Sequence, residues 1–350
     1  MLHLDVNGKW LAQRMTGTQR YANEIVRAMT VFPEAQITVH VPSGSIIPEW
    51  LTDSGATIRH SPFRGPVFEQ VYLPIVTFRK MLLNFAGPAP LLKSKQLVTM
   101  HDATPFRFRS TFRTAFVCFY LVMYYLLGRT ARRLVTVSHF SARELHDVLG
   151  IRESRFTVAG CAADTLVQIK PRKPATLDGV DGPFYLMVGT LAVHKNLAKP
   201  VAAVADSGRT VIVVGASGNQ QVFSDASPLG GAVVAGRLDD AELAWLYRNA
   251  TALIFPSKYE GFGLPPLEAQ TLGCPVVSSS AASMPEVAGL GAIYFDPDNC
   301  SELLEALTRI ESDPDLAPAL RARGYENSQR FSWNRSAETI LAALGDSRNY

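Results

Sequence analysis

The sequence predicts an α/β fold made of two doubly wound, Rossmann-like domains. The chain has 350 residues, 47% hydrophobic and 19% charged, and this length exceeds what one hydrophobic core usually serves. Strand and helix patterns alternate through both halves, with a break at residues 164–183 that holds three prolines and two glycines. The expected parts are an N-terminal domain over 1–165, a linker over 166–183, a C-terminal domain over 184–335 and a terminal segment over 336–350.

The first half begins the alternation. Residues 2–6, 36–41 and 96–102 have the apolar pattern of buried strands. Residues 16–29 repeat apolar side chains at helical spacing, with Thr16 expected to cap the helix. Residues 133–150 predict a strand, a loop and a helix. This rhythm implies a parallel sheet with helices on both faces.

The second half repeats the pattern. Helices are expected over residues 239–250, 265–273 and 300–310. Strands are expected over 184–190, 210–218, 232–238, 251–257 and 274–280. Doubly wound sheets bind ligands at the carboxyl ends of their strands, so a pair of such domains predicts a site in the cleft between them.

Charge and cysteine content exclude several classes of function. A formal net charge of +3 is too mild for a nucleic-acid-binding surface. The four cysteines lie far apart, without a Cys-x-x-Cys pair or a nearby group of histidines. No zinc site or disulfide framework is therefore expected, and a reducing cytosol is the simpler setting.

The apolar segment 114–127 is too short to cross a membrane. As a helix it spans roughly 20 Å, against a hydrocarbon core of about 30 Å. Arginines flank it on both sides, including Arg113 and Arg129. Two interpretations remain open: a buried helix, or an interfacial helix that lies on anionic lipid.

Two glutamates flank a glycine turn in residues 255–269. Glu260 precedes Gly-Phe-Gly at the end of a predicted strand, and Glu268 follows two prolines that suit the start of a helix. The glycines allow a close backbone approach to a ligand, and the helix end would face an anion. Alternatively, Glu268 simply favours the positive end of the helix, in its first turn.

A longer run around these glutamates carries a family resemblance. From Ala252 onward the sequence contains Glu260, Gly-Phe-Gly, Glu268, Gly-Cys-Pro-Val-Val and Pro-Glu-Val in that order. This run resembles the signature block of retaining GT-B glycosyltransferases of the family-four type. The resemblance implies that Glu260 binds hydroxyls of the transferred sugar and that Glu268 binds the ribose hydroxyls. It further implies that the backbone from Gly261 through Phe262 and Gly263 to Leu264 holds sugar and phosphate.

A second block, Tyr-Leu-Met-Val-Gly-Thr and onward, is similar to the family's strand with its following basic triplet. Gly189 and Thr190 end the strand, and Lys195 matches the lysine that neutralises the donor diphosphate. Here His194 stands where the family has arginine, and Ala192 stands where it has an acid. The resemblance places Gly189, Thr190, His194 and Lys195 at the donor.

Four further segments extend the resemblance. Gly236 and Arg237 begin a segment that resembles the family's nucleotide-base loop, in which Asp239 and Glu242 are interpreted as a helix-capping box. Gly17 begins a segment similar to the loop that approaches the diphosphate from the first domain. His101 and Asp102 end the predicted strand 96–102, at a position that touches the donor sugar in the family. The closing segment, with Trp333, implies a last helix that packs back on the N-terminal domain.

The resemblance implies a GT-B fold and a retaining transferase. It would move a sugar, with mannose favoured, from a nucleotide diphosphate sugar to a hydroxyl of a glycan or lipid-linked acceptor. Glu260, His101 and Lys195 would be the catalytic residues, and no metal or other cofactor is expected. The protein would be cytoplasmic, in possible peripheral contact with the anionic inner face of the membrane, with no nucleic-acid partner. Two alternatives remain: a catalytically silent GT-B scaffold subunit and a GT-B sugar-nucleotide epimerase.

Overall fold

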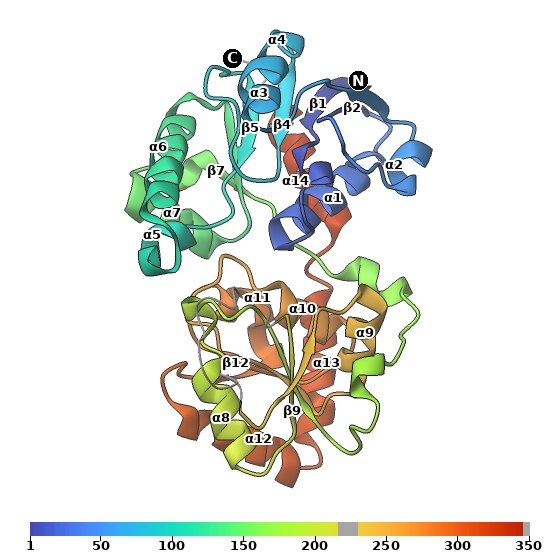
Figure 1. Ribbon diagram of the computed structural model, residues 1–350, viewed down its shortest axis with the longest axis vertical. Helices are drawn as coiled ribbons and strands as arrows, with labels where there is room; N and C mark the ends of the chain where they lie inside the picture. Colours follow the sequence, from blue (N-terminus) through green and yellow to red (C-terminus); the bar gives the residue numbers. More distant parts are fainter. Residues whose placement is uncertain (216–229, 346–350) are drawn as a thin grey trace. The chain divides into compact units, whose positions relative to one another are not determined.

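A computed structural model describes residues 1–215 and 230–345 of the chain (Figure 1). Contacts divide it into two compact units. The first holds residues 1–161 and the C-terminal segment that begins at Trp333, and the second holds residues 162–332. The predicted linker 166–183 belongs by its contacts to the second unit, where Leu177 is buried.

The first unit contains a parallel sheet of seven strands in its described residues, in the order β3-β2-β1-β4-β5-β6-β7. The strands are β1 Leu2–Asn7, β2 Ala35–Val41, β3 Thr57–His60, β4 Met81–Asn84, β5 Gln96–Thr99, β6 Arg133–Thr136 and β7 Phe156–Val158. The helices are α1 Gly17–Met29, α2 Glu49–Asp53, α3 Gly65–Val67, α4 Leu73–Val76, α5 Thr104–Arg107, α6 Thr114–Thr130, α7 His139–Leu149 and α14 Trp333–Gly345. The strand order reverses between β1 and β4, which pair directly, and this reversal is the switch point of a doubly wound sheet.

Helix α6 packs one of its faces into the first unit. Val117, Met123 and Leu127 are buried in a core shared with α7, β5 and β6. A Cβ at Gly128 would lie 2.2 Å from Ile151 Cδ1, so a glycine is required where the helix approaches that residue. The opposite face of α6 is exposed and apolar, with Phe116, Phe119, Leu121, Val122, Tyr125 and Leu126. The segment is therefore half-buried: one face lies in the core, as the first interpretation expects, and the other face is exposed.

Helix α1 packs against α14 in the same unit. The predicted apolar stripe of α1 is fully buried, and the ring of Tyr21 lies 5.8 Å from that of Trp333, centroid to centroid. The Ser336 hydroxyl of α14 donates a hydrogen bond of 2.8 Å to the carbonyl of Gly160. Sequentially distant segments thus close the core of the first unit.

The second unit contains a parallel sheet of six strands in its described residues, in the order β10-β9-β8-β11-β12-β13. The strands are β8 Tyr185–Val188, β9 Val211–Val214, β10 Val233–Gly236, β11 Ala252–Phe255, β12 Val276–Ser279 and β13 Ala292–Phe295. The helices are α8 Ala198–Asp206, α9 Asp240–Asn249, α10 Leu264–Thr271, α11 Met284–Ala288, α12 Cys300–Ser312 and α13 Leu316–Ser328. Here the strand order reverses between β8 and β11, which also pair directly.

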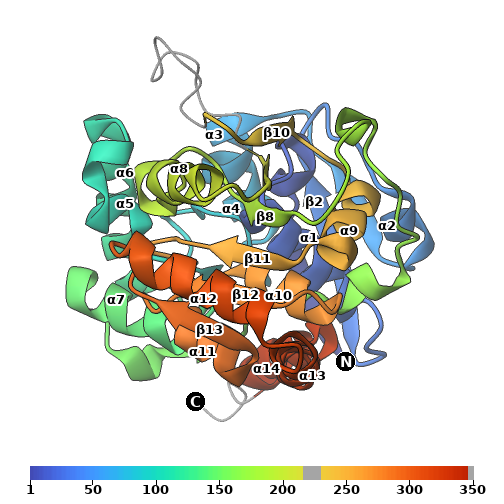
Figure 2. The same cartoon turned by 90° about the horizontal axis from the view of Figure 1, so that it is seen from below.

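Helices cover both faces of this second sheet. Alternate side chains of β8 and β9 point into two separate cores, as the period of a strand requires. One core contains α8 and α12, and the other contains α9 and α10. Figure 2 shows α8 and α9 on opposite sides of β8. Because both faces are buried, the strands are continuously apolar, which is why their segments are easy to recognise in the sequence.

The elements differ from the sequence-based expectation in several places. The prediction does not include the strands β3, β4, β7 and β13, nor the helices α2, α3, α4, α5, α8, α11 and α13. The strand expected at 96–102 ends at Thr99, so His101 and Asp102 lie in the loop beyond it. Of the strand expected at 210–218, residues 211–214 form β9, and 216–218 lie outside the described residues.

Candidate functional site

Lys195 and Glu260 form an ion pair at the switch point of the second sheet. Lys195 follows β8, Glu260 follows β11, and these neighbouring strands bring the two loops together. The Lys195 Nζ donates to Glu260 Oε1 at 2.6 Å. The two side chains are 23% and 13% exposed, so they are partly shielded yet accessible to a ligand. This edge of a doubly wound sheet is where ligands bind.

Asn196 fixes the loop that carries Lys195. Its φ of 52° lies in the left-handed region, which is uncommon for a residue other than glycine. Its amide Nδ2 donates to the carbonyls of Pro256, at 3.1 Å, and Pro297, at 2.7 Å. The loop after β8 is thereby tied to the loops after β11 and β13, which holds Lys195 beside Glu260.

Close packing fixes the Glu-Gly-Phe-Gly loop. Gly263 has a φ of 98°, and a Cβ there would lie 2.2 Å from Met284 Cε. The buried Ser283 hydroxyl donates to the carbonyl of Glu260 at 2.9 Å and to that of Phe262 at 2.8 Å. Helix α10 starts at Leu264, directly after the loop. Because Pro265 and Pro266 have no N–H, the backbone N–H groups at this end are those of Phe262, Gly263 and Leu264.

Glu268 lies further into α10 than predicted. Because the helix begins at Leu264, Glu268 is in the second turn, and the first turn holds no acidic residue. The expected first-turn position is wrong, and interaction with the helix end does not explain this glutamate. Its side chain is only 4% exposed, and Tyr247 of α9 donates a hydrogen bond of 2.8 Å to Oε2. A carboxylate removed from water in this way needs such partners.

Glycines line the neighbouring strand ends of the second unit. The N–H of Gly189, after β8, donates to the carbonyl of Val214 at 3.0 Å, and the N–H of Gly215 donates to the carbonyl of Gly236 at 2.7 Å. A Cβ at Gly215 would lie 3.2 Å from the Gly189 oxygen, so the backbones approach closely here. Beyond these strand ends Thr190 and Arg237 are exposed, whereas His194 is buried. Asp239 and Glu242 form the predicted capping box at the start of α9.

In the first unit, Gly17 is the first residue of α1. Thr16 occupies the N-cap position, but its side chain makes no capping bond and contacts Gln19 instead. A Cβ at Gly17 would meet no atom within 4 Å. The amino end of α1 is therefore open on this side, as an approaching ligand would need.

His101 and Asp102 lie past the carboxyl end of β5. The His101 Nε2 donates to the carbonyl of Phe85 at 2.8 Å, and the ring meets Tyr21 edge-on at 5.1 Å between centroids. Burial lowers the pKa of His101, while the Phe85 carbonyl and Asp102 oppose this shift. Asp102 Oδ1 accepts a hydrogen bond from the N–H of Thr104 at 2.8 Å. The two side chains are thus held by separate partners.

The structure groups the predicted residues into two sets. The second unit gathers Lys195, Glu260, the 261–264 backbone and Glu268 around the ends of β8 and β11. The first unit carries Gly17, His101 and Asp102 at the carboxyl edge of its own sheet. Sequence reasoning missed Asn196, Ser283 and Tyr247. Asn196 completes the basic triplet, but nothing local marks the other two, which act through residues distant in sequence.

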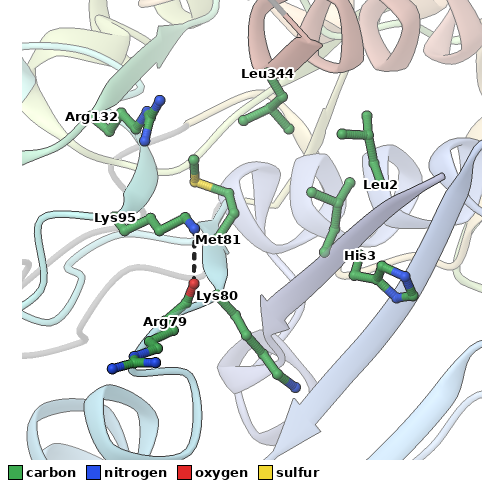
Figure 3. A pocket seen from close by; sticks show the side chains of 9 residues that line it. Leu2, His3, Arg79, Lys80, Met81, Lys95, Arg132 and Leu344 are labelled. Carbon is green, nitrogen blue, oxygen red and sulfur yellow. Dashed lines mark hydrogen bonds between the residues drawn. The ribbon is translucent and has the colours of Figure 1, made fainter. Parts of the chain in front are cut away.

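A separate basic pocket of about 370 Å³ lies at the other edge of the first sheet (Figure 3). It is lined by residues at the amino ends of β1, β4, β5 and β6, and Lys95 donates to the Arg79 carbonyl at 2.8 Å. None of the predicted residues lines it. In the part of the chain that the structure describes, no group of three His, Cys, Asp or Glu residues is placed to hold a metal ion. Within the same residues, no helix is long and apolar enough to cross a membrane.

Two parallel, doubly wound units in one chain define an α/β fold of the GT-B type. Solved structures agree with this fold. Sucrose-phosphate synthase from Thermosynechococcus elongatus superposes with a TM-score of 0.73 at 18% identity, and 99% of each chain is covered. Anabaena HepE in complex with UDP-glucose gives 0.72 at 16% identity, covering 99% of this chain and 100% of that one.

Residues 170–330 match the family Glycosyl transferases group 1. The O-antigen chain mannosyltransferase B of Escherichia coli is 29% identical over 234 residues, which are 61% of this chain and 60% of that protein. The O-antigen chain mannosyltransferase RfbU of Salmonella typhimurium is 27% identical over 245 residues, 68% of this chain and 66% of that protein. The matches thus span no more than about two thirds of these relatives. The fold is therefore of the GT-B type, and residues 170–330 are similar to the Glycosyl transferases group 1 domain.

Proposed function

We propose that the protein is a hexosyltransferase that moves mannose from a nucleotide diphosphate sugar to a hydroxyl of a glycan or lipid-linked acceptor. The observation that carries the proposal is the Lys195–Glu260 pair at the β8/β11 switch point of a group 1 glycosyl transferase domain. The choice of mannose follows the names of the two O-antigen mannosyltransferases. HepE, a structural neighbour, has been solved with UDP-glucose, which supports a nucleotide sugar as the class of donor.

Each side chain of the pair has capacity left for a donor. A lysine ammonium carries three N–H donors, and Glu260 takes one of those of Lys195. The others would bind the diphosphate, while the second oxygen of Glu260 would accept from sugar hydroxyls. The backbone N–H groups at residues 262–264 would add a fixed field at the start of α10. Glu268, oriented by Tyr247, would bind the ribose hydroxyls.

The reaction would depend on charge stabilisation. As the bond from the anomeric carbon to the diphosphate breaks, positive charge grows on the sugar and negative charge on the leaving oxygen. Lys195 and the N–H groups of residues 262–264 would stabilise the leaving diphosphate. The family resemblance assigns Gly17 and His101 of the first unit to the same donor. The acceptor oxygen would bond to the same face of the sugar and pass its proton to the leaving phosphate. We propose that these groups replace a metal ion.

A transfer assay tests the proposal. Purified protein is incubated with GDP-mannose and, separately, UDP-glucose, together with extracted glycan or lipid-linked acceptors, and the products are identified by mass spectrometry. We expect hexose transfer that is lost in Lys195→Ala and Glu260→Ala, while circular dichroism shows both variants folded. Lys199→Ala, an exposed lysine of α8, is the control and should retain activity. Full activity of the two site variants would refute these residue roles.

We also propose that the first unit touches an anionic membrane through α6. Its exposed side carries Phe119 and Val122, which are 52% and 56% exposed. Arg113 precedes the helix and Arg129 lies in its last turn. Apolar side chains with flanking cations are the features of interfacial helices. Such contact would bring a lipid-linked acceptor to the enzyme.

A further inference from the structure

A second buried lysine–glutamate pair lies at the switch point of the first sheet. Lys9 follows β1, Glu69 lies in the helical turn 68–72, and Lys9 Nζ is 3.0 Å from Glu69 Oε2. The side chains are only 10% and 13% exposed. Lys9 Nζ also donates to the carbonyl of Pro88, which follows β4. The pair therefore lies where the chain segments after β1 and β4 leave the sheet in different directions.

Burial reduces the net contribution of this ion pair to the stability of the fold. Desolvation lowers the pKa of Lys9 and raises that of Glu69, and in each case the partner only opposes the shift. Buried ion pairs are often replaceable by apolar residues without loss of stability. Oppositely charged side chains that are shielded from water at the carboxyl edge of an α/β sheet are instead typical of functional sites.

The pair lines a cavity of about 360 Å³, within the range of small-molecule sites. Gln13 and Arg64 contribute further polar groups, and Gly44 and Gly65 leave part of the wall without side chains. Gln13 Oε1 accepts a hydrogen bond from Gln19 of α1 at 2.9 Å. The cavity is thus connected to the start of α1, where Gly17 is proposed to meet the donor.

The two units share one feature, although the glutamate lies after the third strand of the first sheet and after the fourth strand of the second. In each, a lysine follows the first strand of the sheet and pairs with a glutamate at the carboxyl edge: Lys9 with Glu69, and Lys195 with Glu260. A carboxylate accepts from one hydroxyl while an adjacent ammonium donates to the next. Such a pair therefore suits a ring with neighbouring hydroxyl groups. Its partial burial strengthens these bonds relative to water.

We propose that Lys9 and Glu69 bind adjacent hydroxyls of the acceptor sugar in this cavity, and so select the acceptor. The inference rests on the proposed transferase function, because a transferase needs a second site for its acceptor sugar. Glu69 is the acceptor for one sugar hydroxyl and Lys9 is the donor to its neighbour. Arg64 and Gln13 frame the rest of the ring.

Binding of methyl α-D-mannopyranoside and its monodeoxy analogues, measured by saturation-transfer-difference NMR, tests the inference. The wild type should bind the parent glycoside and lose at least about tenfold in affinity when one particular hydroxyl is absent, as expected for a hydrogen bond to a charged group. Glu69→Gln should bind the parent more weakly and respond much less to that deletion. A merely structural role for Glu69 would leave the hydroxyl dependence unchanged.

Two variants keep the test independent of folding. Lys9→Met/Glu69→Leu removes both charges together and should lose glycoside binding, whereas Arg107→Met/Glu144→Leu, an ion pair elsewhere in the first unit, should bind like wild type. Nucleotide binding by thermal shift should persist in every variant, and its absence in wild type would count against the donor site instead. If the wild type binds no methyl mannoside, or Glu69→Gln keeps the wild-type hydroxyl dependence, the inference is overturned.

Discussion

Lys195 and Glu260 gain their position from residues that are distant in the sequence. Asn196 ties the lysine loop to Pro256 and Pro297, and Ser283 holds the backbone of the glutamate loop. The sequence predicts the two charged residues because each lies within its own short motif, although the two are 65 residues apart. It does not predict Ser283, whose hydrogen bonds reach 23 and 21 residues back along the chain. Long-range contacts of this kind leave no periodic signal.

His101 gives the first unit a pH-dependent stability. Burial lowers its pKa below the ordinary value near 6.5, so below that pH the unfolded chain takes up a proton that the folded ring does not. The free energy of unfolding should therefore fall as pH drops below about 6.5, by up to about 1.4 kcal/mol per unit, until the folded pKa is reached. Urea unfolding at several pH values measures this.

His101→Gln provides the comparison for that measurement. The variant lacks the titrating ring, so its loss of stability between pH 7.5 and pH 5.5 should be smaller than that of the wild type. The difference between the two profiles isolates His101 from the other histidines. Parallel profiles for the two proteins would contradict the assignment of a lowered pKa to this ring.

Among the elements, the loop into α10 is the most tightly constrained. Gly263→Ala places a Cβ at a positive φ and 2.2 Å from Met284, so we expect a loss of at least about 2 kcal/mol in unfolding free energy. Gly17→Ala is the matched control, because its Cβ meets no atom within 4 Å. Chemical denaturation measures both. An alanine at position 263 that leaves stability unchanged would show that the loop does not hold this geometry.

For helix α6, hydrophobic periodicity does not predict which face is buried. Its sequence is apolar on nearly every side, so the pattern predicts a helix without indicating which face is buried. The structure supplies that face, and it leaves Phe119 and Val122 outward. The strands missed in the sequence analysis, such as β3 and β7, are only three or four residues long, and β3 is largely exposed. Short segments with mixed burial carry too little pattern to predict.

The membrane contact proposed for the outward face of α6 can be tested. Phe119→Ser/Val122→Ser should weaken binding at low salt to vesicles that contain phosphatidylserine. The reason is that two apolar side chains that would insert into the lipid are replaced by polar ones. Leu290→Ser changes a residue of the second unit that is 85% exposed, and it should bind like the wild type. Vesicle co-sedimentation separates the outcomes. Equal binding by all three proteins, or no binding by the wild type, would refute the contact.

At the scale of the whole molecule, the sequence predicts the class correctly. The alternation of strands and helices indicates two doubly wound sheets, and the structure has the 3-2-1-4-5-6 strand order in the second unit and its seven-stranded extension in the first. That order places the first strand of each sheet at the switch point. The Lys9–Glu69 pair escaped sequence analysis because nothing near either residue marks it, and only the fold brings the two together.

The most direct measurement is calorimetric titration of nucleoside diphosphates into the wild type and Lys195→Ala, in buffer with EDTA. GDP and UDP are compared with guanosine and uridine. We expect the wild type to bind one diphosphate without metal. Lys195→Ala should weaken that binding by about 1.5–3 kcal/mol, roughly 10- to 100-fold, the worth of a hydrogen bond to a charged group. Binding of the matching nucleoside should not change. If neither GDP nor UDP binds the wild type, or if Lys195→Ala binds the diphosphate with equal affinity, a donor site built on this lysine is contradicted.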